Sequence, residues 1–165
     1  MDWFRGRVYI EPEIEYRERE VFGNQRYTTK VVFRITPGGL LAKLGFQVEA
    51  SKKKVDKLQR PVFFGENGIP TLRYEIDGYH PQWKCGLEVE AGRGWMGNAV
   101  YRDLVQAAVM VGVEHLCLAV ANVYRYKTSG RPATSTDYEK TKQLAEAIYG
   151  HSRLRLPYKL VLVEY

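Results

Sequence analysis

Three acidic residues near the middle of the chain have the spacing of a carboxylate site. Glu88 and Glu90 occupy alternate positions in the strand-like run Cys85–Ala91, so both side chains leave the same face of the strand. Asp77 lies in the preceding strand-like run, Leu72–Tyr79, and a hairpin of the two runs would bring it beside Glu88. Grouped carboxylates repel one another unless a cation compensates them, and a hard divalent cation such as Mg²⁺ takes oxygen ligands. The spacing therefore indicates a metal site that could orient a phosphodiester and activate water.

A solvated sheet face would produce the same pattern. Acidic and apolar residues alternate in any strand with one side in water, so the spacing of Asp77, Glu88 and Glu90 leaves two interpretations open. One is a catalytic metal site, and the other is a wet sheet face without chemistry. The choice depends on the elements around the three acids.

The second half of the chain has clear hydrophobic patterns. Its predicted elements are a strand at Leu72–Tyr79, a polar turn at His80–Lys84, a strand at Cys85–Ala91, a helix from Asn98 to about Val111, a strand at His115–Val123, a basic loop at Tyr124–Ser135, a helix from the capping box at Thr136–Glu139 to Gly150, and a buried strand at Tyr158–Glu164. The short turn makes the first two strands antiparallel. The almost wholly apolar run at His115–Val123 is typical of a central strand covered on both faces.

The first half of the chain adds strands and one short helix. Strands are predicted at Arg7–Glu15 and Arg26–Ile35, with a turn at Gly23–Asn24 between them. A helix is predicted to begin at Thr36–Pro37 and to stop at Gly45. The resulting order, α-β-β-α-β-α-β with extra N-terminal strands, predicts an α/β (α+β) fold with a mixed sheet and helices on its faces.

Three short segments resemble the PD-(D/E)XK nuclease superfamily, and within it the type II restriction endonucleases of the BamHI/BglII kind. They are Arg73–Gly78 (RYEIDG), Gly86–Glu90 (GLEVE) and Val100–Leu104 (VYRDL), and the resemblance covers about residues 72–164. In that group an Asp at the end of one strand and a Glu on the next bind the metal. In that group Glu or Gln replaces the family's usual Lys, giving E-x-E or E-x-Q, and an R-D-L-like segment opens the following helix. The resemblance implies a restriction-endonuclease-like core.

The same resemblance implies roles for individual residues. Asp77 and Glu88 would bind Mg²⁺ or Mn²⁺, with the backbone carbonyl of Val89 as a third ligand. Glu90 occupies the position of the family's Lys, so it would act as general base or as a further ligand. Asp77, Glu88 and Glu90 are therefore the candidate catalytic residues. The family often places another acid on its first helix, and Glu49, which follows the short helix predicted here, is left without an assigned role.

Basic residues near these acids could clamp phosphate groups. The candidate nucleic-acid contacts are Lys84 in the turn, Arg93 beyond the acids, Arg102 on the following helix, Lys52, Lys53 and Lys54 in the basic run Ser51–Arg60, and Arg125 and Lys127 in the basic loop. Each of these cations could instead neutralise a nearby acid or lie on a solvated surface.

Composition fits a globular protein that can bind a polyanion. The chain has 165 residues, which predicts a single domain over residues 1–165, with an N-terminal part at 1–70 and a nuclease-like core at 71–165. Lys and Arg number 25 against 19 Asp and Glu, so the net charge is +6. Cys85 and Cys117 lack zinc-ligand spacing and do not suggest a disulfide scaffold, which fits a reducing cytoplasm. No apolar run has the length of a membrane span.

The sequence thus predicts a cytoplasmic, Mg²⁺-dependent endonuclease that hydrolyses phosphodiester bonds, with DNA as its partner and no membrane association. A homodimer is expected by analogy, because two-fold symmetric DNA sites mirror two-fold symmetric proteins. Two alternatives stay open. One is a catalytically inactive nucleic-acid-binding protein, since the family's Lys is absent, and the other is an accessory protein whose acids face solvent.

Overall fold

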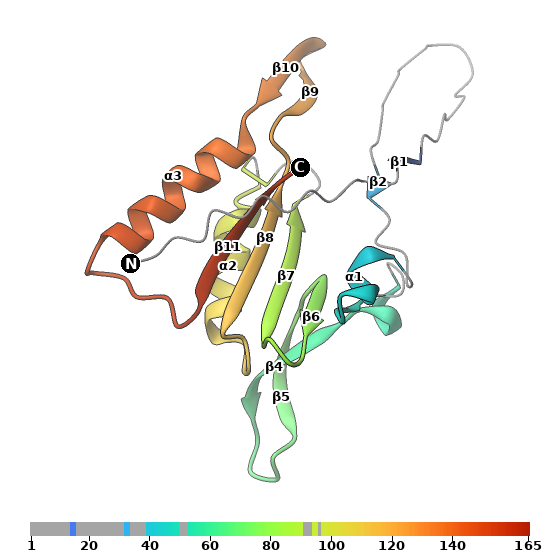
Figure 1. Cartoon of the computed structure of the whole chain (residues 1–165), viewed down its shortest axis with the longest axis vertical. Coiled ribbons are helices and arrows are strands. Elements are labelled where there is room, and N and C mark those ends of the chain that lie inside the picture. The colour runs from blue at the N-terminus through green and yellow to red at the C-terminus, as the bar shows by residue number, and fades with distance from the viewer. Residues whose placement is uncertain (1–13, 16–31, 34–38, 50–52, 91–93, 96) are drawn as a thin grey trace.

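A mixed five-stranded sheet forms the centre of the computed structural model, which describes residues 14–15, 32–33, 39–49, 53–90, 94–95 and 97–165 (Figure 1). The strand order is β11-β8-β7-β6-β3. The strands are β3 (Gln47–Val48), β6 (Gly78–His80), β7 (Cys85–Glu90), β8 (His115–Val120) and β11 (Lys159–Glu164). β7, β8 and β11 are parallel, whereas β6 pairs antiparallel with both β7 and β3. The predicted mixed α+β fold is confirmed at this level.

Two helices cover one face of this sheet. α2 (Ala99–Val109) connects β7 to β8, and α3 (Asp137–Gly150) leads into β11. Both helices contribute side chains to one hydrophobic cluster with Leu116 and Leu118 of β8. Each fully buried Leu of this kind contributes about 1.5–3 kcal/mol to stability. The opposite face is contacted near the β6 edge by the segment after α1 (Leu40–Lys43), where Leu44 offers its carbonyl oxygen to His80 Nε2 at 2.9 Å.

The prediction of a single strand at Leu72–Tyr79 is wrong in one respect, because the segment divides into two strands with different partners. β5 (Pro70–Glu75) pairs antiparallel with β4 (Gln59–Phe64), an unpredicted strand that begins at the end of the basic run. β6 then pairs with β7 and β3 in the main sheet. Apolar and acidic residues alternate in the sequence as far as Asp77, so the sequence pattern does not reveal the change of partner. Asp77 lies at this junction.

A second hairpin replaces the predicted loop at Tyr124–Ser135. β9 (Tyr124–Thr128) and β10 (Arg131–Ser135) pair antiparallel in five register pairs. Ser129 and Gly130 form the turn with φ of 49° and 77°, which matches the left-handed backbone that tight hairpin turns require. The prediction failed because the polar composition of the segment hid a short alternating pattern.

The remaining elements agree with the predictions in part. Only Ile14–Glu15 (β1) and Val32–Phe33 (β2) of the two N-terminal strands are described, and they pair antiparallel. The predicted turn at Gly23–Asn24 and the helix start at Thr36–Pro37 lie outside the described residues. Lys54–Asp56 in the basic run forms a 3-10 turn, η1.

Helix and strand ends differ in detail from the predicted signals. The capping box is wrong in its mechanism, because Thr136 makes no side-chain cap to α3. Instead Asp137 accepts a hydrogen bond from Ser135 Oγ. β11 is the terminal strand of the described sheet rather than a fully buried one, and Val161 is exposed. Within the described parts of the chain, no helix has the length and apolar character to cross a membrane.

Candidate metal-binding and catalytic site

A polar cleft of ≈ 470 Å³ opens between the β4–β5 hairpin, the β5–β6 junction, β7 and α2. Its charged lining residues are the acids Glu49, Glu75, Asp77, Glu88 and Asp103 and the cations Lys57, Arg73 and Arg102. Two of the three predicted acids, Asp77 and Glu88, therefore lie in the same cleft. With every group ionised, these five acids outnumber the three cations by two.

The change of strand partner places Asp77 beside β7. Asp77 Oδ2 accepts a hydrogen bond from the backbone N–H of Val89 at 2.9 Å. β6 pairs with β7 only as far as Leu87, so the Asp77 side chain takes the position that the next backbone partner would occupy. The N–H and C=O groups of one strand residue point to the same side, and the Val89 carbonyl is therefore directed toward the Asp77 edge. This orientation suits the predicted role of that carbonyl as a ligand.

Glu88 is a buried carboxyl group among other acids. It is 9 % exposed and makes no hydrogen bond or ion pair with another described residue. Burial raises its pKa to about 9, with further contributions from the charges of Asp77 and Asp103. The same cause, burial, raises the pKa of Asp77, and the Val89 hydrogen bond opposes that shift. Without a counter-ion Glu88 therefore holds a proton at neutral pH.

Glu90 lies next to the cleft but is not part of its lining. Burial and a hydrogen bond with Asp103 raise its pKa to about 8. Arg102 Nη2 lies 3.8 Å from Glu90 Oε1 and 2.9 Å from Asp103 Oδ1, and its Nε donates to the same Asp103 oxygen at 3.0 Å. Arg102, which is predicted as a phosphate contact, therefore connects the acids of α2 and β7. Its side chain is 60 % exposed, so it can also reach a ligand from the solvent side.

Three further residues complete the site and were not predicted as part of it. Asp103 is 3 % exposed on the buried side of α2. Its position three residues after Val100, on the apolar face of the helix, is a signal that the sequence did contain. Lys57 donates to Glu49 Oε2 at 2.5 Å, and this hydrogen bond raises the pKa of Lys57. Glu49 and Lys57 come from segments distant in sequence from β7, and no local pattern marks them.

A divalent cation fits the chemistry of this donor set. The donors are hard oxygen atoms, the cleft carries an excess of acids, and the buried carboxyl of Glu88 lacks a cationic partner among the described residues. Within the described ranges, no three Asp, Glu, His or Cys side chains are already grouped as ligands of one ion. Mg²⁺ commonly binds one or two carboxylates and keeps several waters. Asp77, Glu88 and the Val89 carbonyl would satisfy that requirement.

The other predicted contacts are dispersed. Lys84 lies in the β6–β7 turn, at the opposite end of β7 from Glu90, where it binds Glu114 at 2.6 Å. Lys53 and Lys54 lie at η1, and Arg125 and Lys127 lie on β9. Lys52 and Arg93 fall outside the described residues. Of the predicted cations, the structure brings Arg102 to the acids.

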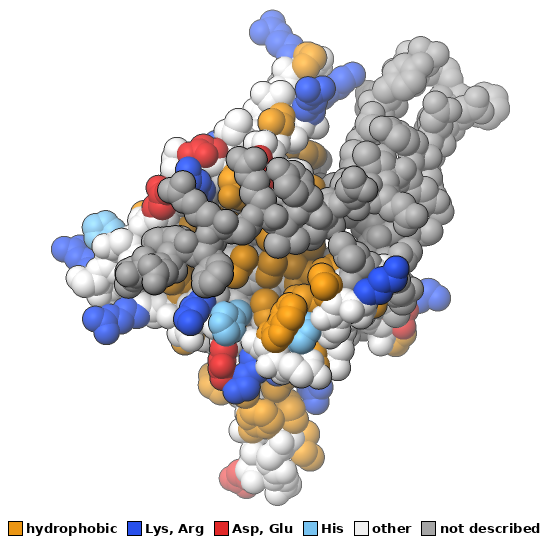
Figure 2. All heavy atoms as spheres, in the orientation of Figure 1, with side chains coloured by type: hydrophobic (Ala, Val, Ile, Leu, Met, Phe, Trp, Pro, Cys, Tyr) orange, Lys and Arg blue, Asp and Glu red, His pale blue; other side chains and the backbone are white. Residues whose placement is uncertain are grey.

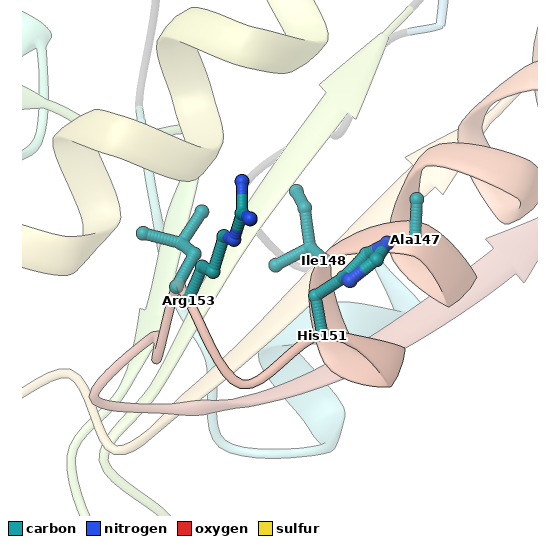
Figure 3. Close-up of a pocket in the computed structure, with 5 residues that line it drawn as sticks. Ala147, Ile148, His151 and Arg153 are labelled. Carbon is teal, nitrogen blue, oxygen red and sulfur yellow. The ribbon is translucent and has the colours of Figure 1, made fainter.

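A second hollow, of ≈ 520 Å³, lies at the C-terminal end of α3 (Figure 3). It is lined by Ala147, Ile148, His151, Arg153 and Leu154. This lining contains no carboxylate and is largely apolar, so it does not offer the donors that the predicted chemistry needs. The candidate site is therefore the cleft around Asp77 and Glu88.

Comparison of the chain with protein-family models, with curated proteins and with solved structures finds no match. The resemblance to nucleases rests on the sequence motifs between Arg73 and Leu104.

Proposed function

We propose that this protein is a metal-dependent DNA endonuclease that hydrolyses phosphodiester bonds. The observation that carries the proposal is the burial of Glu88 beside Asp77 and Asp103 in a cleft that also contains Lys57 and Arg102. A purely structural wet sheet face would keep its acids exposed and ionised. Here the acids are concentrated in a partly enclosed site with cations at its rim, as phosphoryl transfer requires.

The residues of the cleft have distinct roles in this proposal. Asp77, Glu88 and the Val89 carbonyl hold Mg²⁺ or Mn²⁺, which when bound neutralises charge on the phosphate and makes a coordinated water more acidic. Lys57 and Arg102 contact the non-bridging oxygens of the scissile phosphate. Glu90 accepts a proton from the attacking water in its ionised form, whose population grows as the pH rises toward its pKa of about 8.

The bond changes follow from in-line attack on phosphorus. A new P–O bond forms from water, and the bond from phosphorus to the 3′ oxygen breaks. The products are 5′-phosphate and 3′-hydroxyl ends, as in the nucleases that the motifs resemble. Cleavage of both strands at a two-fold symmetric site would need a homodimer.

Plasmid cleavage tests this proposal. Wild-type protein is incubated with supercoiled plasmid and Mg²⁺ or Mn²⁺, beside the variants Asp77→Asn and Glu88→Gln. We expect each variant to lower the nicking rate by about 100-fold or more, because each removes a charge that the ion requires. Glu114→Gln is the matched control, since Glu114 is exposed at the other end of β7. Nicking by Glu88→Gln at the wild-type rate would refute the site.

A second candidate function is nucleic-acid binding without catalysis. It is favoured by the absence, among the described residues, of a ready group of three metal ligands, and by Glu90 at the position of the family's Lys. It predicts salt-dependent DNA binding by the wild-type protein with no nicking in either metal. Metal-dependent nicking that is lost in Glu88→Gln decides against it.

A further inference from the structure

The β9–β10 hairpin is a regular two-stranded arm. All five residues of β9 pair with residues of β10, from Tyr124 with Ser135 to Thr128 with Arg131. The connection is the two-residue turn Ser129–Gly130, which is the shortest common hairpin loop. Figure 1 shows that the hairpin extends beyond the end of the sheet. Its strands of five residues give it a reach of about 17 Å, at about 3.4 Å per residue.

The arm starts at the edge of the sheet that carries the acids. β7 and β8 are parallel, and Val120 at the end of β8 lies in register with Glu90 at the end of β7. β9 begins four positions after Val120, at Tyr124. The hairpin therefore leaves the sheet at the end of β7 where Glu88 and Glu90 lie, and not at the Lys84 end.

The charge of the arm is of one sign. Arg125, Lys127 and Arg131 are exposed, and residues 124–136 contain no Asp or Glu. None of the three cations forms an ion pair with another described residue. Figure 2 shows Lys and Arg side chains projecting from this end of the molecule. Because nothing in the described structure neutralises them, these cations are available to an external anion.

The two faces of β9 differ. Arg125 and Lys127 occupy alternate positions and leave the same face, where their partners across the hairpin are the small residues Thr134 and Pro132. The rings of Tyr124 and Tyr126 stack on the other face, with their centroids 5.7 Å apart and an interplanar angle of 12°, and this stacking stiffens the arm. Arg125 and Lys127 are thus presented together on one face of a rigid support, with no bulky side chain between them, whereas Arg131, opposite Thr128, lies on the tyrosine face.

We propose that the β9–β10 hairpin is an arm that binds the phosphodiester backbone of the nucleic acid held at the cleft. This inference rests on the proposed function for the identity of the polyanion. Successive phosphates offer a line of anionic oxygens that suits a row of cations, and Arg can bind them through two N–H groups. The arm adds affinity and fixes the direction of the strand, without contacting the scissile phosphate.

Salt-dependent DNA binding tests the arm. Binding of the full chain to a fluorescent DNA duplex is measured in EDTA, so that no cleavage occurs, over a range of NaCl concentrations. The variant carries Arg125→Ala, Lys127→Ala and Arg131→Ala together. We expect the magnitude of the slope of log K against log[NaCl] to fall by about 1.8, since Arg125 and Lys127 share one face and each lost phosphate contact removes about 0.9. The matched control carries Arg153→Ala, Arg155→Ala and Lys159→Ala, three exposed cations at the opposite end of β11.

The outcomes separate this inference from the proposed function. A fall in slope that is confined to the hairpin variant supports the arm, whether or not the wild-type protein nicks plasmid. Equal falls in slope for both triple variants overturn the arm, because positive charge anywhere on the surface would then have the same effect on binding. Absence of DNA and RNA binding by the wild-type protein also overturns it, as does hairpin-dependent binding only to vesicles containing phosphatidylserine. If the triple variant unfolds at a lower temperature than the wild type, the pair Arg125→Gln with Lys127→Gln replaces it, with an expected fall of about 1.8.

Discussion

The two ends of strand β7 carry similar side chains in opposite electrostatic conditions. At its start, Lys84 and Glu114 form an exposed ion pair at 2.6 Å, with about half of each side chain in solvent. Toward its end, Glu88 is buried among acids, and the nearest cations are engaged elsewhere. The pKa of Glu114 is lowered by its bond to Lys84, whereas burial raises the pKa of Glu88 to about 9.

Under the proposed function, this difference separates a structural acid, Glu114, from an acid of the site, Glu88. A single exposed pair satisfies both charges and contributes little to stability. At the cleft the acids outnumber the cations, so the folded protein must hold extra protons or an extra cation. Excess charge that is buried and uncompensated destabilises a fold, and its presence in a cleft is typical of a site that binds a ligand.

The largest expected effect is a dependence of stability on pH in the absence of metal. The pKa of Glu88 rises from 4.5 in the unfolded chain to about 9 in the folded protein, so the folded state binds this proton more tightly. Its contribution to stability is complete below about pH 4.5 and is lost as the pH rises through about 9. One pKa unit corresponds to about 1.4 kcal/mol, so the loss amounts to several kcal/mol. Thermal unfolding in EDTA should therefore show a falling midpoint between about pH 5 and about pH 9.

Two variants at the ends of β7 control this measurement. Glu88→Gln should remove much of the decrease in the unfolding midpoint with rising pH, and Glu114→Gln should leave that decrease as in the wild type. Saturating Mg²⁺ or Mn²⁺ should raise the wild-type midpoint most at the alkaline end, because the ion replaces the proton. A Glu88→Gln protein with the full wild-type dependence on pH would show that the acids at the two ends of β7 do not differ as proposed.

The next largest effect compares two lysines. Lys57 and Lys84 form bonds of similar length to Glu49 and Glu114, but the Lys57 side chain is 21 % exposed and that of Lys84 is 52 % exposed. Lys57→Met leaves Glu49 without its cation beside Asp77, and should lower the thermal midpoint at pH 8 by about 2–4 °C. Lys84→Met should leave it unchanged. The double variant Lys57→Met with Glu49→Gln should regain stability, and equal effects at the two lysines would contradict the comparison.

The sequence predicts which acids lie close together better than it predicts the strand pairings that bring them there. Asp77 and Glu88 come together as expected, because Asp77 directly precedes β6 and Glu88 follows Leu87, the last residue of β7 that pairs with β6. The partner switch at Ile76–Asp77 was not predictable from alternation, since it depends on β4, a strand that was not predicted and of which only Gln59 and Arg60 belong to the basic run. Glu49 and Lys57 reach the cleft only through pairings of β3 and β4 with distant strands. Such contacts depend on tertiary structure and produce no periodic pattern in the local sequence.

The smallest effect distinguishes two cations that the sequence treats alike. Arg102 binds Asp103 at the cleft and keeps 60 % of its side chain exposed, whereas Lys84 is held by Glu114 at the far end of β7. In the salt titration of DNA binding, Arg102→Gln should reduce the slope by about 0.9, the value of one phosphate contact. Gln can still donate a hydrogen bond to Asp103, so the buried acid keeps a partner. Lys84→Gln should not change the slope, because its ammonium group is already neutralised and lies away from the acids. A change in slope for Lys84→Gln as large as that for Arg102→Gln would mean that nucleic acid extends along the whole of β7. The two ends of β7 would then not differ in DNA binding, even if they differed in their effect on stability.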